Sequence, residues 1–323
     1  MNTMNVYCCG GAATNIGKTL LKVTGKPEEG FANIATYFVD TSSSNIDSTI
    51  PSNKLFLLDG VDGSGKVRSS NYAAAAEHVR EILHKFNPGD INVVLHSTGG
   101  GSGSVMGPLI TSELLNRDCL TIVIMIGSTS CELEVSNTAN TLKSYEGISK
   151  LRGKPVVAGF YQNVQGKKRS EIDTEVHLLI SFLAVLFSGN NAELDTSDLR
   201  NLLNYHVVTQ HTPKLSLLEV HTGDIILDSN HTLVSVATLT EADLTTDIEI
   251  LVGYQATGLI NPAASSFMPI TLPLHTCVIN NHFPKVMADL QKKLDAYNAL
   301  KGLVVEKSLL GSNDSASDEG LIL

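Results

Sequence analysis

A run of glycine and serine in the first third of the chain could bind phosphate. Residues 91–96 before the run predict a short buried strand, and residues 105–116 after it predict a helix. A strand, a glycine loop and a helix in this order aim backbone N–H groups and a helix N-terminus at an anion. Glycine lets the backbone approach the ligand closely, because it has no Cβ. The residues of this run are Thr98, Gly99, Gly100, Gly101, Ser102, Gly103 and Ser104.

Two other interpretations of this run fit less well. A flexible Gly/Ser linker is disfavoured by the strand and helix that flank the run directly. A nucleophilic serine in a GxSxG turn requires a glycine two residues away on each side. Around Ser102 these positions are Gly100 and Ser104, so the second glycine is missing. The spacing therefore disfavours a serine hydrolase.

Two aspartates, Asp195 and Asp198, stand three residues apart where a short helix is expected to begin. Both carboxylates could accept hydrogen bonds from one water molecule and orient it for attack. The same spacing suits a structural pair, in which Asp195 caps the helix and Asp198 is an acid of its first turn. The residues alone favour the structural pair.

Two further segments nearly match the phosphate-binding motif GxxxxGK(S/T). The first, residues 59–68, follows an expected strand at 55–58, but Val67 stands where a hydroxyl should bind Mg²⁺. The second ends in Gly-Lys-Thr at 17–19, but Ala12 stands where its first glycine should be. Two imperfect loops are weaker evidence than one complete loop. A P-loop kinase therefore remains the alternative class.

Strand-like and helix-like segments alternate through the first half of the chain. The predicted strands are residues 4–9, 34–39, 55–58, 91–96, 121–126 and 155–161, and the predicted helices are residues 16–23, 72–86, 105–116 and 137–151. This alternation predicts a parallel, doubly wound α/β sheet with helices on both faces. The glycine loops, and the pair Asp40 and Thr41, follow strands at their carboxyl ends, where such sheets bind ligands.

The second half has a different pattern. A helix predicted from Glu171 to Phe187 is apolar nearly all round over residues 177–187, which indicates burial between two domains. Beyond it, the predicted strands are residues 233–239, 248–254 and 270–279, and an amphipathic helix is predicted over 284–300. Residues 311–323 are polar and acidic before an apolar end, a composition typical of a disordered tail.

Composition excludes several classes of protein. The formal net charge of −10 over 323 residues disfavours nucleic acid or an anionic membrane as a direct partner. The N-terminus lacks the pattern of a signal peptide, and the longest apolar run, 176–187, is too short to span a bilayer. Five cysteines without a CxxC pair, and histidines without an HExxH motif, predict a reduced cytosolic protein without a metal site.

Together these features resemble the tubulin/FtsZ superfamily of polymerising GTPases. Its signature, GGGTG(S/T), is matched by residues 99–104, with Ser102 for the usual threonine. The continuation at 103–110 and the ending at 318–323 are especially similar to the tubulins of large bacteriophages. The resemblance implies a Rossmann-like GTPase sheet, a long central helix, a smaller α+β domain and an acidic tail. The corresponding ranges are a GTP-binding domain at 1–169, the central helix at 170–187, a second (activation) domain at 188–310 and the tail at 311–323.

The resemblance also implies a site for GTP or GDP, with Mg²⁺ held by the nucleotide phosphates. Asp173 is chemically apt for guanine, because its carboxylate can accept hydrogen bonds from both N1–H and N2–H. The alternative is an acid favoured by the helix dipole. Besides the signature run and Asp173, the implied contacts are Gly11, Ala12, Ala13 and Asn15 in the first loop, Asp40 and Thr41 in the second, Gly63, Ser64, Gly65 and Arg68 in the third, and Asn140 and Asn163 near ribose or guanine.

By the same resemblance, residues 190–198 form a catalytic loop that enters the site of the next subunit. Asp195 and Asp198 match its N-x-D-x-x-D pattern, with Glu193 in place of the frequent asparagine. Hydrolysis would then require polymerisation. The implied protein is a GTPase of the host cytoplasm that forms head-to-tail filaments and positions phage DNA or its enclosing compartment. Its tail would dock on the neighbouring subunit through Asp318, Glu319, Leu321, Ile322 and Leu323. A P-loop kinase and a non-polymerising nucleotide-binding protein remain the alternatives.

Overall fold

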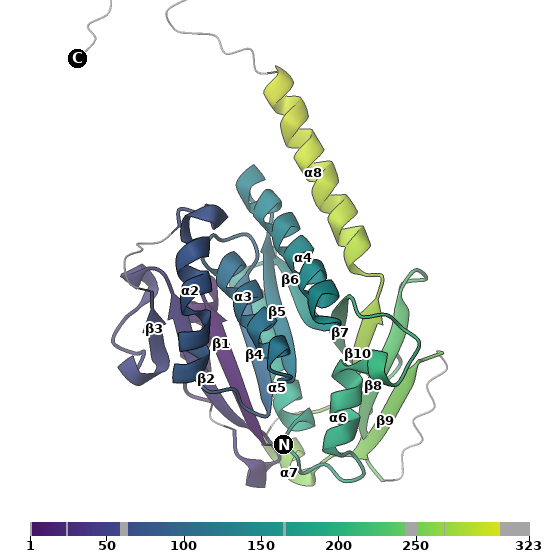
Figure 1. Ribbon diagram of the computed structural model, residues 1–323. Helices are drawn as coiled ribbons and strands as arrows, with labels where there is room; N and C mark the ends of the chain where they lie inside the picture. Colours follow the sequence, from purple (N-terminus) through teal and green to yellow (C-terminus); the bar gives the residue numbers. More distant parts are fainter. Residues whose placement is uncertain are drawn as a thin grey trace, which may run out of the picture.

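The computed structural model describes residues 2–23, 25–58, 64–163, 166–242, 251–267 and 269–303. Within these ranges the strands form one ten-stranded sheet, in the order β3-β2-β1-β4-β5-β6-β7-β10-β8-β9. Figure 1 shows helices on both of its faces. The sheet is therefore continuous between the first and second halves of the chain. The division into a GTP-binding and a second domain stays a prediction.

The first half is the predicted doubly wound α/β unit. Its strands are β1 (Thr3–Cys9), β2 (Asn33–Asp40), β3 (Leu55–Leu57), β4 (Ile91–Ser97), β5 (Thr121–Ser128) and β6 (Val156–Asn163). Its helices are α1 (Gly11–Leu20), α2 (Tyr72–Lys85), α3 (Gly103–Asn116), α4 (Glu132–Arg152) and α5 (Arg169–Leu186). All of these strands pair in parallel. The strand order reverses between β1 and β4, and ligands bind at such a switch point, outside the carboxyl ends of the strands.

The second half adds strands to the same sheet. Its elements are α6 (Thr196–Leu203), β7 (Leu215–Thr222), β8 (Thr232–Thr240), β9 (Tyr254–Leu259), α7 (Pro262–Phe267), β10 (Leu274–Asn280) and α8 (Phe283–Leu303). Short 3₁₀ helices cover Pro27–Glu29, Ser43–Asn45, Ser52–Lys54, Arg68–Asn71 and Tyr205–Val207. β7 pairs in parallel with β6 and antiparallel with β10, so it joins the two halves.

One predicted strand of the second half is wrong in position. A strand was expected over 248–254, but β9 begins at Tyr254, and residues 251–253 precede it outside any strand. Residues 248–250 lie outside the described ranges. β9 pairs in parallel with β8. An ideal Cβ at Gly253 would lie 2.8 Å from the carbonyl oxygen of Val234, so a side chain at this position would crowd β8.

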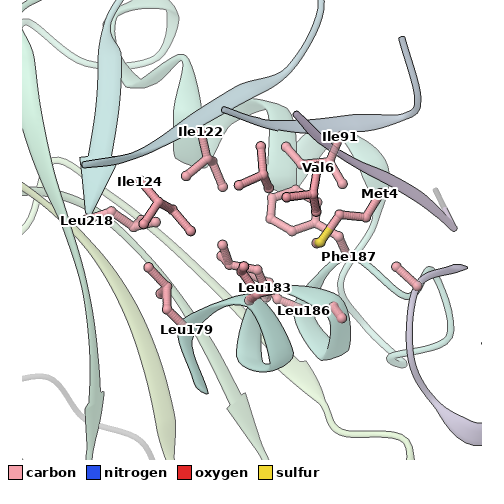
Figure 2. Packing of buried hydrophobic residues seen from close by; sticks show 14 of the residues in the cluster. Met4, Val6, Ile91, Ile122, Ile124, Leu179, Leu183, Leu186, Phe187 and Leu218 are labelled. Carbon is pink, nitrogen blue, oxygen red and sulfur yellow. The ribbon is translucent and has the colours of Figure 1, made fainter. Parts of the chain in front are cut away.

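α5 is the predicted core helix, and its packing sets the position of the site. Leu179, Leu183 and Leu186 face apolar side chains of the sheet, among them Ile91 and Ile124 (Figure 2). Burying side chains of this size contributes about 1.5–3 kcal/mol each to stability. The prediction that the helix is buried on every side is wrong at its middle, because 46% of Leu178 is exposed. The burial is complete only over the last turn.

The core also contains a neutral histidine that makes stability depend on pH. His96 in β4 is fully buried, and its Nε2 lies 2.6 Å from the hydroxyl of Tyr145 in α4. Its Nδ1 lies 3.1 Å from the carbonyl oxygen of Ser97, so Nδ1–H donates there and Nε2 accepts from the tyrosine. Burial lowers the pKa of His96 from 6.5 to about 4.

We expect the free energy of unfolding to be fully present above pH 6.5 and to fall as the pH drops toward 4. In this window the unfolded histidine is protonated and the folded one is not, so the drop due to His96 is about 3 kcal/mol. Urea unfolding at several pH values measures it. The double variant His96→Leu/Tyr145→Phe should lose this part of the pH dependence. If the free energy of unfolding of that variant falls with pH as steeply as in the wild type, groups other than His96 cause the pH dependence.

No helix among the described residues is long and apolar enough to cross a membrane.

Candidate nucleotide-binding site

A cavity of about 500 Å³ opens at the predicted place, the switch point between β1 and β4. The first turn of α1 and the glycine loop before α3 form its floor, and α5 contributes its other end. The size and position suit a small ligand, with polar backbone on one side. The parallel strands bring these loops together because their carboxyl ends lie at one edge of the sheet.

Two helix N-termini meet at the floor of the cavity. Gly10 caps α1 with φ 79°, and an ideal Cβ on it would lie 2.9 Å from the backbone nitrogen of Gly103, where α3 begins. A Cβ on Gly103 would lie 2.6 Å from the carbonyl oxygen of Cys9. Only glycine fits at both positions. The positive ends of two helices therefore converge on one anion site.

Both helices begin earlier than predicted. α1 starts at Gly11 instead of residue 16, and α3 starts at Gly103 instead of residue 105. The first turns of both helices are rich in glycine and small residues, so they lack the regularly spaced large apolar residues from which the helices were predicted. The correction strengthens the phosphate prediction, because the glycine-rich residues are themselves the first helical turns and expose their N–H groups.

The glycine loop contributes most but not all of its predicted residues to the cavity. The lining residues are Gly99, Gly100, Gly101, Ser102 and Gly103. Thr98 and Ser104 do not line it. The Thr98 hydroxyl bonds within the core to the Ile126 carbonyl oxygen (3.3 Å), and the Ser104 hydroxyl donates to the Gly101 carbonyl oxygen (2.9 Å). These two residues hold the shape of the loop.

The first two predicted loops divide in the same way. Gly11, Ala12 and Asn15 line the cavity, whereas Ala13 is fully buried in the core. Asp40 lines the cavity as predicted. Thr41 does not line it; its Oγ1 lies 2.5 Å from the Ser102 hydroxyl oxygen and accepts a hydrogen bond from Asn71 (3.1 Å). Thr41 therefore positions Ser102.

Asp40 is a buried carboxylate at the edge of the cavity. Only 2% of it is exposed, and its Oδ1 accepts hydrogen bonds from the backbone nitrogens of Thr41 (2.7 Å) and Ser42 (3.4 Å). Burial raises the pKa of Asp40 in spite of these bonds. The two backbone hydrogen bonds orient the carboxylate at the start of the second loop.

The third predicted loop is held against the glycine loop, but two of its predicted residues do not line the cavity. Ser64 and Lys66 line the cavity; Gly65 does not, and Gly63 lies outside the described residues. Arg68 does not line the cavity either. Its guanidinium donates to the Asn137 carbonyl oxygen (3.2 Å), to the Thr141 hydroxyl and to the Ser144 hydroxyl (3.1 Å). In this structure Arg68 thus contacts α4.

One face of α4 forms the support of the third loop. We call it the α4 polar stripe: Glu134, Asn137, Thr141 and Ser144. Their spacing of three and four residues places them on one side of the helix. Asn137 donates through Nδ2 to the carbonyl oxygens of Lys66 (2.7 Å) and Gly99 (3.0 Å), so it ties the third loop to the glycine loop. Sequence reasoning missed this stripe.

The far end of the cavity is lined by residues of β6 and α5. They are Asn163, Arg169, Ile172 and Asp173. Burial raises the pKa of Asp173. Asp173 is the fifth residue of α5, beyond the first turn where the helix dipole stabilises acids, so its position argues against the alternative role. Asn140, predicted near the ribose, is exposed on α4 and does not line the cavity.

Charged residues of the lining include some that sequence reasoning did not select. The described acids are Asp40, Glu134 and Asp173, and the described cations are Lys66 and Arg169. Lys66 was visible in the near match to GxxxxGK(S/T), whereas nothing in the sequence pointed to Glu134. Among the described residues, no three His, Cys, Asp or Glu side chains are grouped to hold a metal ion.

Asp195 and Asp198 lie away from this cavity. Asp195 caps α6: its Oδ1 accepts from the backbone nitrogens of Ser197 (2.6 Å) and Asp198 (3.0 Å), and Asp198 accepts in return from the backbone nitrogen of Asp195 (3.0 Å). The pair is therefore the capping box of the structural interpretation. Asp198 also accepts a hydrogen bond from the Tyr254 hydroxyl (2.8 Å).

The length of α5 separates the two groups of residues. Asp173 lies near its N-terminus, and Asp195 follows its C-terminus, which ends at Leu186. An α-helix of 18 residues is about 27 Å long. α6 packs against β8 and β9 at this other end of α5 (Figure 1). One subunit therefore does not bring its own aspartates to its own cavity.

Curated proteins similar in sequence to this chain come from Pseudomonas phages. No protein-family model matches the chain. The phage tubulin-like protein of Pseudomonas phage phiKZ is 24% identical over 337 residues, which cover 98% of this chain and 97% of that protein. The phage tubulin-like protein of Pseudomonas phage PhiPA3 is 34% identical over 201 residues, 62% of this chain and 60% of that protein.

Solved structures of phage tubulins have a fold similar to that of this chain over its whole length. The protofilament of TubZ from bacteriophage PhiKZ superposes with a TM-score of 0.86 at 25% identity, and the phage tubulin PhuZ with GDP superposes with a TM-score of 0.85 at 20% identity; each comparison covers 100% of both chains. These matches show that the chain has the fold of the tubulin/FtsZ superfamily, as the glycine signature predicted. In sequence it is similar to the phage tubulin-like proteins.

Proposed function

We propose that the protein binds GTP in this cavity, hydrolyses it to GDP and phosphate, and polymerises head to tail into filaments. One observation carries the proposal: the cavity and the Asp195–Asp198 pair stand at opposite ends of α5. When subunits stack along this axis, the aspartates of one subunit reach the cavity of the next. Such a heterologous contact does not close on itself, so it generates filaments.

The cavity has the chemistry for a guanine nucleotide. The converging N-termini of α1 and α3 suit the phosphates, and the carboxylate of Asp173 suits the N1–H and N2–H donors of guanine. Adenine offers no such pair of donors. Mg²⁺ would be held mainly by the phosphates. The solved structure of the phage tubulin PhuZ with GDP supports this assignment, since that protein carries a guanine nucleotide.

The capping box prepares the aspartates for a role at the next subunit. It fixes both carboxylates at the first turn of α6, and each carboxylate oxygen has more than one lone pair, so it can accept a further hydrogen bond from water. In the assembled site these groups would orient the water that attacks the γ-phosphate. The structural and catalytic interpretations of Asp195 and Asp198 are thus compatible. Polymerisation would then activate hydrolysis.

The cellular role is proposed from similarity. Relatives named as phage tubulin-like and a solved TubZ protofilament support a filament built in the cytoplasm of an infected host. There it would form a spindle-like array that positions phage DNA or the compartment around it.

Light scattering separates this function from its alternatives. GTP, but not ATP, should raise the scattering of the purified full chain, with a lag and a critical concentration. Phosphate release per subunit should rise with protein concentration. A P-loop kinase would instead transfer phosphate to an acceptor without scattering. A nucleotide-binding protein that does not polymerise would bind GTP without scattering, and its phosphate release per subunit would not rise with protein concentration. The result expected for the kinase or for this protein would contradict the proposal.

The C-terminal tail gives a separate prediction, although residues 304–323 lie outside the described residues. Acids such as Asp318 and Glu319 followed by Leu321, Ile322 and Leu323 suit docking, because charge steers the tail and the aliphatic groups bury. We expect deletion of residues 312–323 to leave GTP affinity intact and to raise the critical concentration severalfold. Sedimentation measures this. Added salt should reproduce part of the effect, since screening acts over about 8–10 Å.

A solubilising tail is the competing role. It would leave the critical concentration of the truncated protein equal to that of the full chain. The three terminal aliphatic residues argue against that role, because a solubilising segment gains nothing from them.

A further inference from the structure

We propose that His177 is a positioning residue for the nucleotide, which fixes the guanine-binding end of α5 relative to the phosphate-binding helix α1. The inference rests on the proposed function and names the residue that sets the distance between the two ends of the cavity. The His177 Nε2 lies 2.6 Å from the Thr19 hydroxyl oxygen and 3.3 Å from the Ile16 carbonyl oxygen, both on α1. Among the described residues, no other hydrogen bond joins α1 to α5.

The two helices that His177 joins supply opposite ends of the cavity. The first turn of α1 lines the phosphate end, and Asp173 of α5 lines the base end. His177 follows Asp173 by four residues, so both lie on the same side of α5, about 6 Å apart along its axis. A hydrogen bond from His177 to α1 therefore acts one helical turn from the carboxylate that would accept the guanine donors.

The contacts around Thr19 determine which ring nitrogen of His177 carries hydrogen. The Thr19 hydroxyl has one hydrogen, and it donates to the Ile16 carbonyl oxygen at 2.6 Å. The hydroxyl oxygen is then left as an acceptor, like the carbonyl oxygen, so the His177 Nε2 must carry a hydrogen to contact both. Nε2–H donates to α1 in the neutral ring and in the protonated ring alike. The contact therefore persists whether or not the ring is charged.

The apolar packing around these helices does not fix their relative position in the same way. Ile16 of α1 and Ile172 and Val176 of α5 belong to one buried apolar cluster. Apolar burial is non-directional, whereas a hydrogen bond requires a particular distance and angle between its groups. The apolar cluster therefore holds the helices in the core, and the bonds of His177 select one position of α5 along α1.

A nucleotide gains affinity from this fixed position because it is one molecule bound at two ends. Once its phosphates are bound, its base binds without a second loss of translational and rotational freedom, provided that the two ends of the cavity already match its length. A ligand that occupies only one end gains nothing from the distance between them. His177 therefore contributes to the affinity for GTP and not to the affinity for its separate parts.

Competition titrations of the full chain with GTP, guanosine and tripolyphosphate, in Mg²⁺, test the proposal. His177→Leu removes the donor and keeps a side chain that favours helix. It should weaken GTP about 3- to 10-fold, the loss of one net hydrogen bond, and weaken guanosine and tripolyphosphate less than about twofold. His177→Gln keeps an N–H donor on a side chain of similar reach, so all three affinities should stay within about twofold of the wild type.

The partner of His177 on α1 gives an independent test. Thr19→Val replaces the hydroxyl with a methyl group of similar size and leaves the Ile16 carbonyl oxygen as an acceptor for Nε2–H. We expect it to weaken GTP about two- to fivefold. The losses in the double variant with His177→Leu should not add, because both substitutions remove the same hydrogen bond.

A matched histidine outside the cavity controls for general effects of the substitution. His84→Leu removes an exposed histidine from the last turn of α2, and it should leave all three affinities unchanged. The role of His177 would be overturned by unchanged GTP affinity in His177→Leu, by equal losses for GTP and for either of its parts, or by a loss in His177→Gln as large as that in His177→Leu. A wild-type chain that binds ATP as tightly as GTP would overturn the proposed function itself.

Discussion

We expect Asp173→Ala to lower GTP affinity about 100-fold or more and to abolish the preference for GTP over ATP. The carboxylate lines the base end of the cavity and would accept two charge-assisted hydrogen bonds from guanine, each worth about 1.5–3 kcal/mol. In the variant the N1–H and N2–H donors of guanine would be buried without acceptors, which is the costly case. Competition titrations of GTP against ATP measure both quantities.

The same helix offers a matched control for this variant. Glu171 is an exposed acid two residues earlier, in the first turn of α5, and it does not line the cavity. Glu171→Ala removes the same charge and should leave both affinities within about twofold. Asp173→Asn tests the chemistry further, because its amide keeps one acceptor and places donors against guanine. Retention of full GTP selectivity in Asp173→Ala would show that guanine is recognised elsewhere.

The second large effect concerns hydrolysis. Asp198→Ala should spare GTP binding and assembly and slow phosphate release in the polymer about 100-fold, leaving filaments that persist. Asp198 lies at the start of α6, away from its own cavity, so the loss would occur at the site of the neighbouring subunit. Phosphate release and scattering, followed in one sample, give both readouts.

Loss of the capping box complicates this variant, because removing a cap costs about 0.5–2 kcal/mol of stability. Asp195→Ser resolves the ambiguity, since serine caps a helix about as well as aspartate but has no carboxylate. It should keep the thermal midpoint and still lose hydrolysis. Mixing Asp198→Ala with a chain whose glycine loop is blocked by Gly103→Val should restore part of the turnover at mixed contacts. A monomer that hydrolyses GTP equally fast at all dilutions would contradict catalysis between subunits.

The floor of the cavity could be predicted from sequence because its chemistry resides in the backbone. Gly10 and Gly103 are glycine because a Cβ at either position would lie within 3 Å of a backbone atom. Such a requirement appears in the sequence directly, as a glycine-rich loop. The alternation of strands and helices predicted the first half of the sheet for a similar reason: each strand there is a short apolar run. The segment over Leu215–Thr222 lacks a clear alternation, and β7 was not predicted.

The walls of the cavity could not be predicted in this way. The charge of Arg68 does not reveal whether it faces phosphate or α4, because that depends on how the third loop packs on a helix more than sixty residues later. Asn140 was expected in the site, but on α4 the face of Asn137 is turned to the loops and Asn140 is exposed. The helix was predicted to start at residue 137, whereas α4 starts at Glu132. The sequence did not indicate which of its faces is turned to the loops.

The placement of two half-sites at the ends of α5 has a numerical consequence for the proposed filament. A filament of n subunits has n − 1 junctions, so it contains one complete hydrolytic centre fewer than it has bound nucleotides. At one tip the last subunit would present an open cavity to solvent with no aspartates of a neighbour at it, and GTP bound there would last until another subunit arrives. The two tips of such a filament would therefore differ in chemistry as well as in shape.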